Sequence, residues 1–268
     1  MEWAVSGTGR RWAAEALVAL ALAFWAVVAG AQPLEDGGRH RVVEVIDGDT
    51  VVLDDGRQVR FVGIQAPKLP LGRKGFEEWP LAQESKDHLA RLALDRMVAL
   101  RYGGARKDRH GRRLAHLYLE DGTWVQGDLL SAGLARVYTW PDNRAMARAL
   151  LDAERSARQA GRGIWSHPFY RILKAEEAGG HIDSFQLVEG VVQHAAAARG
   201  RVFLNFGADW RTDFTVEIEA ADMKTFRDSG LDPKALEGRR VRVRGWIKSR
   251  NGPAIQATHP EQIEILPP

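Results

Sequence analysis

Two aspartates separated by one glycine stand where a strand-forming run meets a turn, in Val45-Ile46-Asp47-Gly48-Asp49-Thr50. Such a turn projects at least one carboxylate outward, and carboxylate oxygens are ligands that hard cations such as calcium prefer. An Asp-Gly-Asp sequence on its own is more typical of a plain turn. The pair therefore indicates a metal site only where other charged side chains join it.

Arginines are the side chains that we expect to join it. Arg60 stands in the third predicted strand, and Arg112 lies in the basic loop 106–113 ahead of the fifth. Guanidinium groups offer planar paired donors to a phosphate, and they stabilise the negative charge that grows during phosphoryl transfer. If the fold brings both arginines to the carboxylate-bearing turn, the site suits a phosphodiester.

The hydrophobic pattern around these residues predicts a small mixed domain. Three β-branched runs separated by Asp-Gly turns are typical of a meander, and a helical period begins near Pro80. Five short strands with helices between and after them favour a closed barrel over a parallel sheet. The predicted strands are 42–46, 50–53, 59–64, 98–102 and 114–119, and the later helices are 125–132 and 145–159.

Four motifs in this order resemble the staphylococcal nuclease (thermonuclease) family over roughly residues 41–165, and we assign residues 41–168 to this domain. The resemblance implies a mainly β fold with α (α+β), built as a five-stranded OB barrel with three helices. In catalytic members it also implies calcium-dependent cleavage of DNA or RNA by an activated water. The motifs are Val45-Ile46-Asp47-Gly48-Asp49-Thr50, Val59-Arg60-Phe61-Val62-Gly63-Ile64-Gln65-Ala66-Pro67, Asp108-Arg109-His110-Gly111-Arg112-Arg113-Leu114-Ala115 and Leu130-Ser131-Ala132-Gly133-Leu134-Ala135.

The resemblance assigns roles residue by residue. Asp49 falls on a metal ligand, and Arg60 and Arg112 fall on the two phosphate-binding arginines of the catalytic site. Gln65 replaces a second metal carboxylate, so it keeps a carbonyl oxygen but loses a charge, which weakens a site for a hard cation. Lys68 stands at the position of the general base, and a lysine that is protonated at neutral pH accepts no proton.

Two interpretations of Lys68 follow. Either its ammonium group reaches toward Asp49 and partly replaces the calcium charge, or Lys68 is a solvated loop residue. In the first case the pocket is basic and binds phosphate with no metal, so the calcium site is weak or absent. Glu77 and Glu78 are candidates for a substitute base, although acidic residues there also suit the start of a helix.

A second strand-rich unit is predicted for residues 184–268, after a linker at 169–183. Its five strand-like runs favour a second, OB-like β-barrel domain. The whole chain is thus expected to hold two small barrels.

Within this unit, Arg240, Arg242 and Arg244 alternate with valines, so one face of a strand carries an arginine stripe. Such a face binds single-stranded nucleic acid when an aromatic side chain stacks on the bases, and Trp246 or Trp210 is placed to do so. The alternative is that the arginines protect the edge of a sheet.

The first 31 residues have the three parts of a secretory signal peptide. Arg10 and Arg11 precede an uncharged apolar run at 16–28, and Ala29-Gly30-Ala31 precedes the expected cleavage point. The run is shorter than the roughly 20 residues of a spanning helix, so we expect a mature chain without a membrane span. The protein is expected to be exported to the periplasm or secreted, with anchoring by this segment as the alternative.

The absence of cysteine and the distribution of charge limit the functions that the chain can have. The 268 residues include no cysteine, which excludes disulfides and thiol catalysis. The net charge is +3, while residues 183–268 carry twelve basic and twelve acidic side chains, so the basic excess lies earlier in the chain and favours a polyanionic partner. Two functions remain open: an exported nuclease that cleaves DNA or RNA, or an inactive barrel that binds nucleic acid, nucleotide or an envelope partner.

Overall fold

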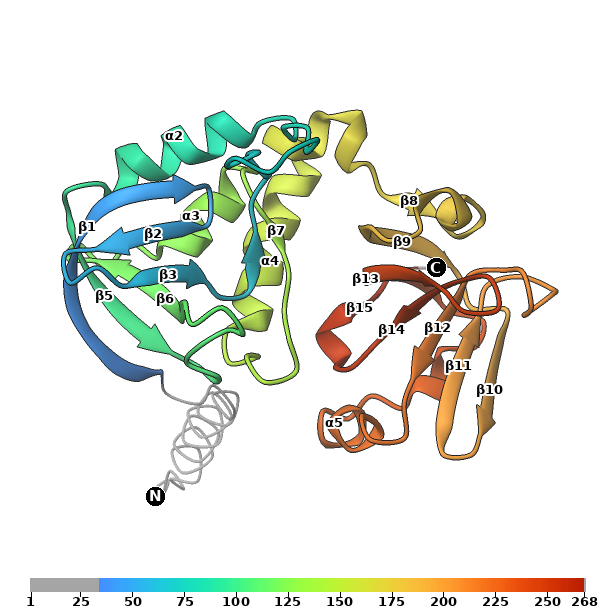
Figure 1. Cartoon of the computed structure of the whole chain (residues 1–268). Coiled ribbons are helices and arrows are strands. Elements are labelled where there is room, and N and C mark those ends of the chain that lie inside the picture. Colours follow the sequence, from blue (N-terminus) through green and yellow to red (C-terminus); the bar gives the residue numbers. More distant parts are fainter. Residues whose placement is uncertain (1–33, 268) are drawn as a thin grey trace, which may run out of the picture. The chain divides into compact units, whose positions relative to one another are not determined.

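The computed structural model describes residues 34–267, and the predicted signal segment lies outside the described residues. Five strands form a closed barrel in the order β1, β2, β3, β6, β5 (Figure 1). β3 and β6 run parallel, and β1 pairs antiparallel with both β2 and β5. The expected α+β fold with a five-stranded barrel is therefore confirmed. The strands are β1 (Glu35–Asp47), β2 (Thr50–Leu53), β3 (Gln58–Phe61), β5 (Met97–Tyr102) and β6 (Arg113–Leu119).

The third strand is shorter than predicted because Gly63 turns the chain. Gly63 has a φ of 82°, which a glycine adopts without strain, and a side chain there would overlap Leu150. After this turn the chain forms β4 (Ile64–Gln65), which pairs with β7 (Arg136–Val137) in a separate two-stranded sheet. The turn therefore carries Gln65 out of the barrel and beside Arg136.

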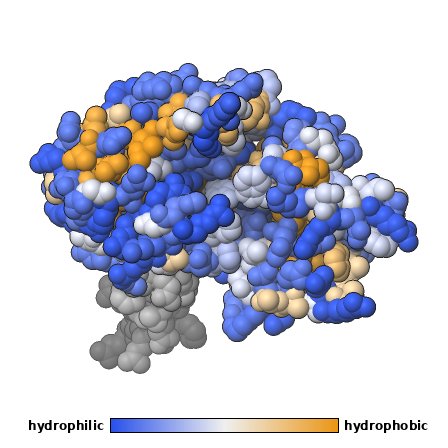
Figure 2. All heavy atoms as spheres, in the orientation of Figure 1, coloured by the Kyte–Doolittle hydropathy of each residue, from blue (hydrophilic) through white to orange (hydrophobic). Residues whose placement is uncertain are grey.

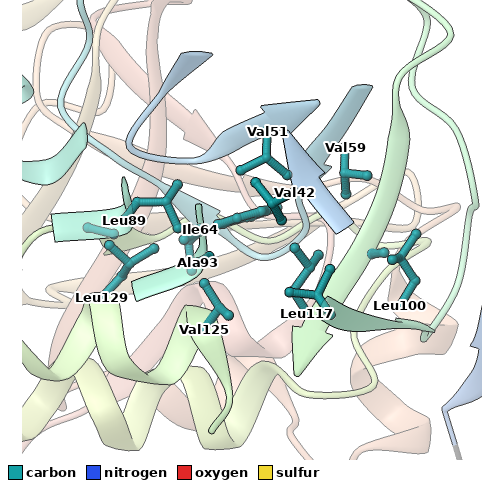
Figure 3. Close-up of a cluster of buried hydrophobic side chains, with 14 of the residues drawn as sticks. Val42, Val51, Val59, Ile64, Leu89, Ala93, Leu100, Leu117, Val125 and Leu129 are labelled. Carbon is teal, nitrogen blue, oxygen red and sulfur yellow. The ribbon is translucent and has the colours of Figure 1, made fainter. Parts of the chain in front are cut away.

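Three helices close the barrel core. They are α2 (Ala82–Ala93), α3 (Val125–Ser131) and α4 (Ala147–Gln159), so the first begins slightly later than the pattern predicts. Figure 3 shows barrel valines and leucines meeting Leu89 and Ala93 of α2 and Val125 and Leu129 of α3. Each buried side chain of this size contributes about 1.5–3 kcal/mol, so this cluster holds the helices against the strands that carry the aspartates.

The C-terminal strands form an eight-stranded sheet rather than the five strands expected. Their pairing follows the order β10, β11, β12, β14, β13, β9, β8, with β15 on the free side of β13. A short helix, α5 (Met223–Asp228), follows β12. The strands are β8 (Leu173–Lys174), β9 (Phe185–Val191), β10 (His194–Ala198), β11 (Arg201–Asn205), β12 (Thr215–Ile218), β13 (Arg240–Ser249), β14 (Pro253–Gln256) and β15 (Ile263–Ile265).

The pairing in this sheet repeats that of the barrel. β11–β12 is antiparallel, β12–β14 is parallel, and β14–β13 and β13–β9 are antiparallel, as in β2–β3, β3–β6, β6–β5 and β5–β1. Only Val192 and Gln193 separate β9 from β10, which stand near opposite ends of the pairing order. In the barrel, the single long strand β1 pairs with both β2 and β5 and so closes the sheet. In the C-terminal sheet, two separate strands, β9 and β10, take the place of β1, and no pairing between them closes the sheet.

The predicted linker is an ordered segment. Residues 168–181 hold the 3-10 turns Pro168–Tyr170 and Ala175–His181 with β8 between them, and β8 pairs in parallel with β9. Tyr170 is buried, and its hydroxyl donates to the Pro80 carbonyl oxygen at 2.7 Å. The segment is therefore packed against the barrel and the C-terminal sheet.

The face drawn in Figure 2 is mainly hydrophilic, with a hydrophobic band on the side of the barrel where β1 and β2 lie and a smaller hydrophobic patch over the C-terminal sheet. Val43 is exposed in β1. None of the helices described for residues 34–267 is long and apolar enough to cross a membrane.

Candidate functional site

The aspartate-bearing turn joins β1 to β2 and lies under α2. A Cβ at Gly48 would overlap the Oγ of Ser85 and the Cβ of Ala66, so only glycine allows the helix and the following loop to pack this closely. Ser85 is held in turn by the Leu134 carbonyl oxygen, to which its hydroxyl donates at 2.9 Å. Asp49 is 0 % exposed as a result.

Lys68 lies directly on the Asp49 carboxylate. Its Nζ donates to Asp49 Oδ1 at 2.8 Å and to Oδ2 at 2.7 Å, and it is 3.3 Å from Asp47 Oδ2. The Ala66 N–H also donates to Asp49 Oδ2 at 2.7 Å, which fixes the loop that carries Lys68. The structure therefore shows the ammonium contact with Asp49, and Lys68 is not a solvated loop residue.

Arg60 completes the charged cluster. Its Nη1 lies 3.3 Å from Asp49 Oδ2 and donates to the Phe61 carbonyl oxygen at 2.9 Å, while its Nη2 donates to the Ile64 carbonyl oxygen at 2.8 Å. These carbonyl contacts hold the guanidinium at the point where β3 turns into β4. Within the described residues its Nε donates no hydrogen bond, so that N–H remains for a ligand.

The two aspartates differ in their electrostatic surroundings. Burial alone raises the pKa of Asp49, but the charges of Arg60 and Lys68 outweigh it and leave that pKa below its usual value. Burial raises the pKa of Asp47, and the neighbouring Asp49 charge adds to the rise, while Lys68 opposes it. Asp49 is thus the anion that the two cations share.

A calcium ion does not fit beside Lys68. Calcium binds oxygen at about 2.3–2.6 Å and gathers six to eight oxygen ligands. The Lys68 nitrogen already stands 2.7 and 2.8 Å from both oxygens of Asp49, so an ion bound to both would overlap it and meet a like charge. The residues present at this place hold an ammonium group instead of a metal.

Gln65, the other expected metal ligand, is engaged elsewhere. Its Oε1 accepts hydrogen bonds from Arg136 Nε at 3.1 Å and Nη2 at 2.8 Å. Arg136 is buried, has no ion pair among the described residues, and lies 4.7 Å from the ring of Phe185. Burial lowers the pKa of Arg136 to about 10, partly offset by Tyr170. Arg136 was not among the site residues predicted from the sequence. The turn at Gly63 places Gln65 beside Arg136, and this turn is not evident from the residue pattern.

Arg112 lies in the basic loop and is paired within it. Its Nε donates to Asp108 Oδ2 at 2.7 Å, and Asp108 Oδ1 also accepts the Arg112 and His110 N–H groups. Arg60 therefore contacts Asp49, while the carboxylate that pairs with Arg112 is Asp108. The parallel pairing of Arg60 with Leu114 still places the end of this loop beside Arg60.

The arginine stripe of β13 is not an open binding face. The valines face the core as predicted, but Arg244 is 1 % exposed, and its guanidinium donates to Glu154 of α4 at 2.9 and 3.0 Å and to Glu264 at 2.5 Å. Arg240 and Arg242 pair with Glu189. The prediction that these arginines bind nucleic acid therefore fails for the buried Arg244, and carboxylates occupy the other two.

Glu264, one carboxylate of this network, remains ionised far into the acid range. Burial raises the pKa of Glu264, but Arg244, Arg158 and Arg242 together lower it to about 2. Glu154 also accepts the Val137 N–H at 2.5 Å and pairs with Arg158 at 2.7 Å. The network thus joins α4 and β7 to the C-terminal sheet.

Trp246, the proposed stacking residue, is half-exposed. Its indole Nε1 donates to the Tyr138 hydroxyl at 2.9 Å, and the Lys248 ammonium lies 5.6 Å from its ring centre.

Glu77 and Glu78, the candidates for a substitute base, are exposed and precede α2, so they do not start that helix. Neither glutamate has an ion pair or side-chain hydrogen bond within residues 34–267.

The closed barrel, its three helices and the charged turn define a nuclease-like protein, and comparison with known proteins agrees. The family model described as "Staphylococcal nuclease homologue" matches residues 58–167. A thermonuclease of Staphylococcus hyicus is 30 % identical over 131 residues, which are 48 % of this chain and 76 % of that protein. An uncharacterized endonuclease of Escherichia coli O157:H7 is 33 % identical over 129 residues, 47 % of this chain and 76 % of that protein.

This chain belongs to the staphylococcal nuclease homologue family. One similarity extends further along the chain: endonuclease YhcR of Bacillus subtilis (strain 168) is 28 % identical over 197 residues, which are 68 % of this chain and 15 % of that protein.

Proposed function

We propose that this barrel binds the phosphodiester backbone of DNA or RNA through a cationic site that needs no metal ion. The observation that carries the proposal is the Lys68 ammonium, 2.7 and 2.8 Å from the two oxygens of a fully buried Asp49. Lys68 supplies a fixed positive charge at the place where a metal-binding relative would hold its cation. Its three N–H groups face carboxylate oxygens, so it balances charge and leaves phosphate contact to its neighbours.

Those neighbours are Arg60 and the basic loop. Arg60 keeps its Nε–H for a ligand, and the end of the loop lies beside it through the pairing of β3 with β6. Arginine offers donors that match phosphate geometry. Lys107 and Arg109 are exposed in the same loop, so a strand that passes Arg60 meets further positive charge.

We do not propose that the site hydrolyses the phosphodiester, because Lys68 stands where the family resemblance places the proton-accepting residue. A general base must lie within hydrogen-bond reach of the attacking water. Lys68 occupies the position that the family resemblance gives to the base, and it holds both aspartates. The names of the relatives favour the alternative of a cleaving enzyme, and we propose weak or absent cleavage on the ground of the Lys68 contacts.

Binding of a fluorescent single-stranded oligonucleotide, measured by anisotropy in EDTA, tests this proposal. We expect binding to persist in EDTA and to weaken about tenfold or more in Lys68→Met, because the Asp49 charge is then less compensated and repels the phosphate. Like charges about 4 Å apart near a protein surface repel by about 4 kcal/mol, and 1.4 kcal/mol is a factor of ten. Lys74→Met is the matched control, because Lys74 is an exposed lysine in the same loop. Loss of binding in EDTA, or equal affinities of the two variants, would contradict the proposal.

A further inference from the structure

A cavity of about 300 Å³ lies on the outward face of the C-terminal sheet. It is separate from the charged turn of the barrel, and its lining residues come from β10, β11, β12 and two neighbouring loops. They include Phe203, Asn205, Trp210, Thr215, Arg250 and Asn251.

The floor of the cavity follows from strand alternation. Val202 and Leu204 of β11 are buried in the core, so Phe203 and Asn205 point to the other face. On β12, Glu217 lies opposite Phe203 and Thr215 lies opposite Asn205. A half-buried aromatic ring and a buried amide thus stand side by side on a face that the core does not use.

Two loops in contact with each other form the wall. Trp210 lies in the loop between β11 and β12 and is 51 % exposed, with the Arg211 guanidinium 4.7 Å from its ring centre. Arg250 and Asn251 lie in the turn between β13 and β14, where the backbone N–H of Arg250 donates to the Gly252 carbonyl oxygen at 2.8 Å. A Cβ at Gly252 would lie 2.7 Å from the carbonyl oxygen of Thr212, so glycine lets the two loops meet.

The charged groups of the cavity neutralise each other, and its polar groups leave one hydrogen-bond donor unused. Arg250 Nη1 donates to Glu217 Oε2 at 2.8 Å, which neutralises both side chains. Thr215 Oγ1 donates to Asn205 Oδ1 at 3.2 Å, while the Asn205 Nδ2 group donates no hydrogen bond among the described residues. The cavity therefore presents two aromatic surfaces and a free amide donor without a net charge.

We propose that this cavity binds one base of single-stranded DNA or RNA, stacked on Trp210 and hydrogen-bonded at its edge by Asn205. A planar heterocycle with apolar faces and a polar edge matches aromatic side chains together with an amide. The inference rests on the proposed function, because the same strand would supply the phosphodiester at the barrel.

The two sites differ in their expected response to salt. Binding to the barrel depends on phosphate contacts, which release counterions and weaken as salt rises. Binding in the cavity depends on stacking and on neutral hydrogen bonds, so the part of the affinity that Trp210 supplies should change little with salt. This difference separates failure of one proposal from failure of the other.

The test compares the full chain with Trp210→Ala for binding of a short oligothymidylate and of an abasic strand with the same number of phosphates. We expect Trp210→Ala to weaken oligothymidylate binding by about 5- to 100-fold, as for the loss of one stacked base, and to leave abasic binding unchanged. Asn205→Ala should weaken oligothymidylate binding in the same direction. The control is Trp140→Ala, since Trp140 is similarly exposed at 55 % and lies outside the cavity.

Equal weakening of both strands by Trp210→Ala, or no effect of Trp210→Ala on oligothymidylate, would overturn the base site and leave the barrel proposal standing. The base site would also be overturned, in favour of a glycan site, if the full chain binds a neutral oligosaccharide and Trp210→Ala abolishes that binding but keeps oligothymidylate binding. Circular dichroism of the variants shows that each is folded. If Lys68→Met and Arg60→Ala leave abasic binding intact while Trp210→Ala reduces oligothymidylate binding, the barrel proposal fails and the base site stands.

Discussion

A chain that carries Gln65→Asp together with Lys68→Glu is expected to cleave single-stranded DNA in the presence of calcium at least about 10² times faster than the unaltered chain, since general-base catalysis contributes about 10²–10⁴. The change removes the ammonium that lies on Asp49 and restores a carboxylate at each position where the family resemblance places one. Gel-based digestion with calcium or with EDTA measures the effect.

The fold is expected to tolerate both changes. Lys68 lies in a loop whose position is also fixed by the Ala66 N–H bond to Asp49. An aspartate at position 65 provides a carboxylate beside Arg136, a buried guanidinium that now has only the neutral Gln65 as a side-chain hydrogen-bond partner within residues 34–267. One carboxylate oxygen can accept from Arg136, as Gln65 Oε1 does now, and its charge compensates the buried cation, while the second oxygen is left for calcium.

Two control variants make the result specific. Adding Asp49→Ala to the double variant is expected to abolish the gained activity, because the carboxylate that Lys68 now holds would be missing. Lys68→Glu alone is expected to give less activity than the double variant, since only one carboxylate is restored. Calcium-dependent cleavage by the unaltered chain at the rate of the double variant would refute the account of Lys68.

Replacing Arg244 by methionine is expected to lower the free energy of unfolding by about 3–5 kcal/mol, the usual cost of leaving a buried charge without its partner. Glu154 is fully buried, and Arg244 contacts both of its carboxylate oxygens. Arg158 would remain as the neighbouring cation, at 2.7 Å from one oxygen. Equilibrium unfolding in urea at neutral pH measures the change.

Lys248→Met is the matched control for this experiment. Lys248 lies on the same strand and pairs with Asp183 at 2.7 Å, but both side chains are exposed. Exposed ion pairs contribute about 0–1 kcal/mol, so little change is expected. The double variant Arg244→Met with Glu154→Gln should recover part of the loss, because the stranded charge is gone. Equal losses in Arg244→Met and Lys248→Met would show that the buried network does not stabilise the fold.

The barrel was predictable because local pattern and tertiary structure agree there. Alternating valines in the meander, the helical period after Pro80 and the glycine after α3 each specify their own element. The extent of β1 was not predictable, because its first half is held by pairing with the distant β5 and contains Gly37 and Gly38, which disfavour strands locally.

The candidate site was predictable in part. The contact between Lys68 and Asp49 was one of two interpretations of the sequence, and the structure shows it. The partners of Gln65 and Arg112 were not predictable, since they depend on a turn at Gly63 and on a carboxylate within the basic loop. Periodicity correctly gave the face of β13 on which Arg244 lies, but it carries no information about α4, whose Glu154 covers that face.

The C-terminal cavity also depends on long-range structure. Trp210 and Asn205 lie close in sequence, but Arg250 and Asn251 come to the cavity only because β14 pairs with β12. The sequence offered Trp246 or Trp210 as the residue that stacks on a base. Of these two tryptophans, Trp210 lines the C-terminal cavity and Trp246 does not.

Calorimetric titration of the purified chain with calcium tests the central claim most directly. We predict no saturable calcium binding tighter than about 1 mM, the weak end of protein calcium sites, because the Lys68 ammonium already neutralises Asp49 and Gln65 is held by Arg136. Saturable calcium binding in the micromolar range, lost in Asp49→Ala, would contradict the account.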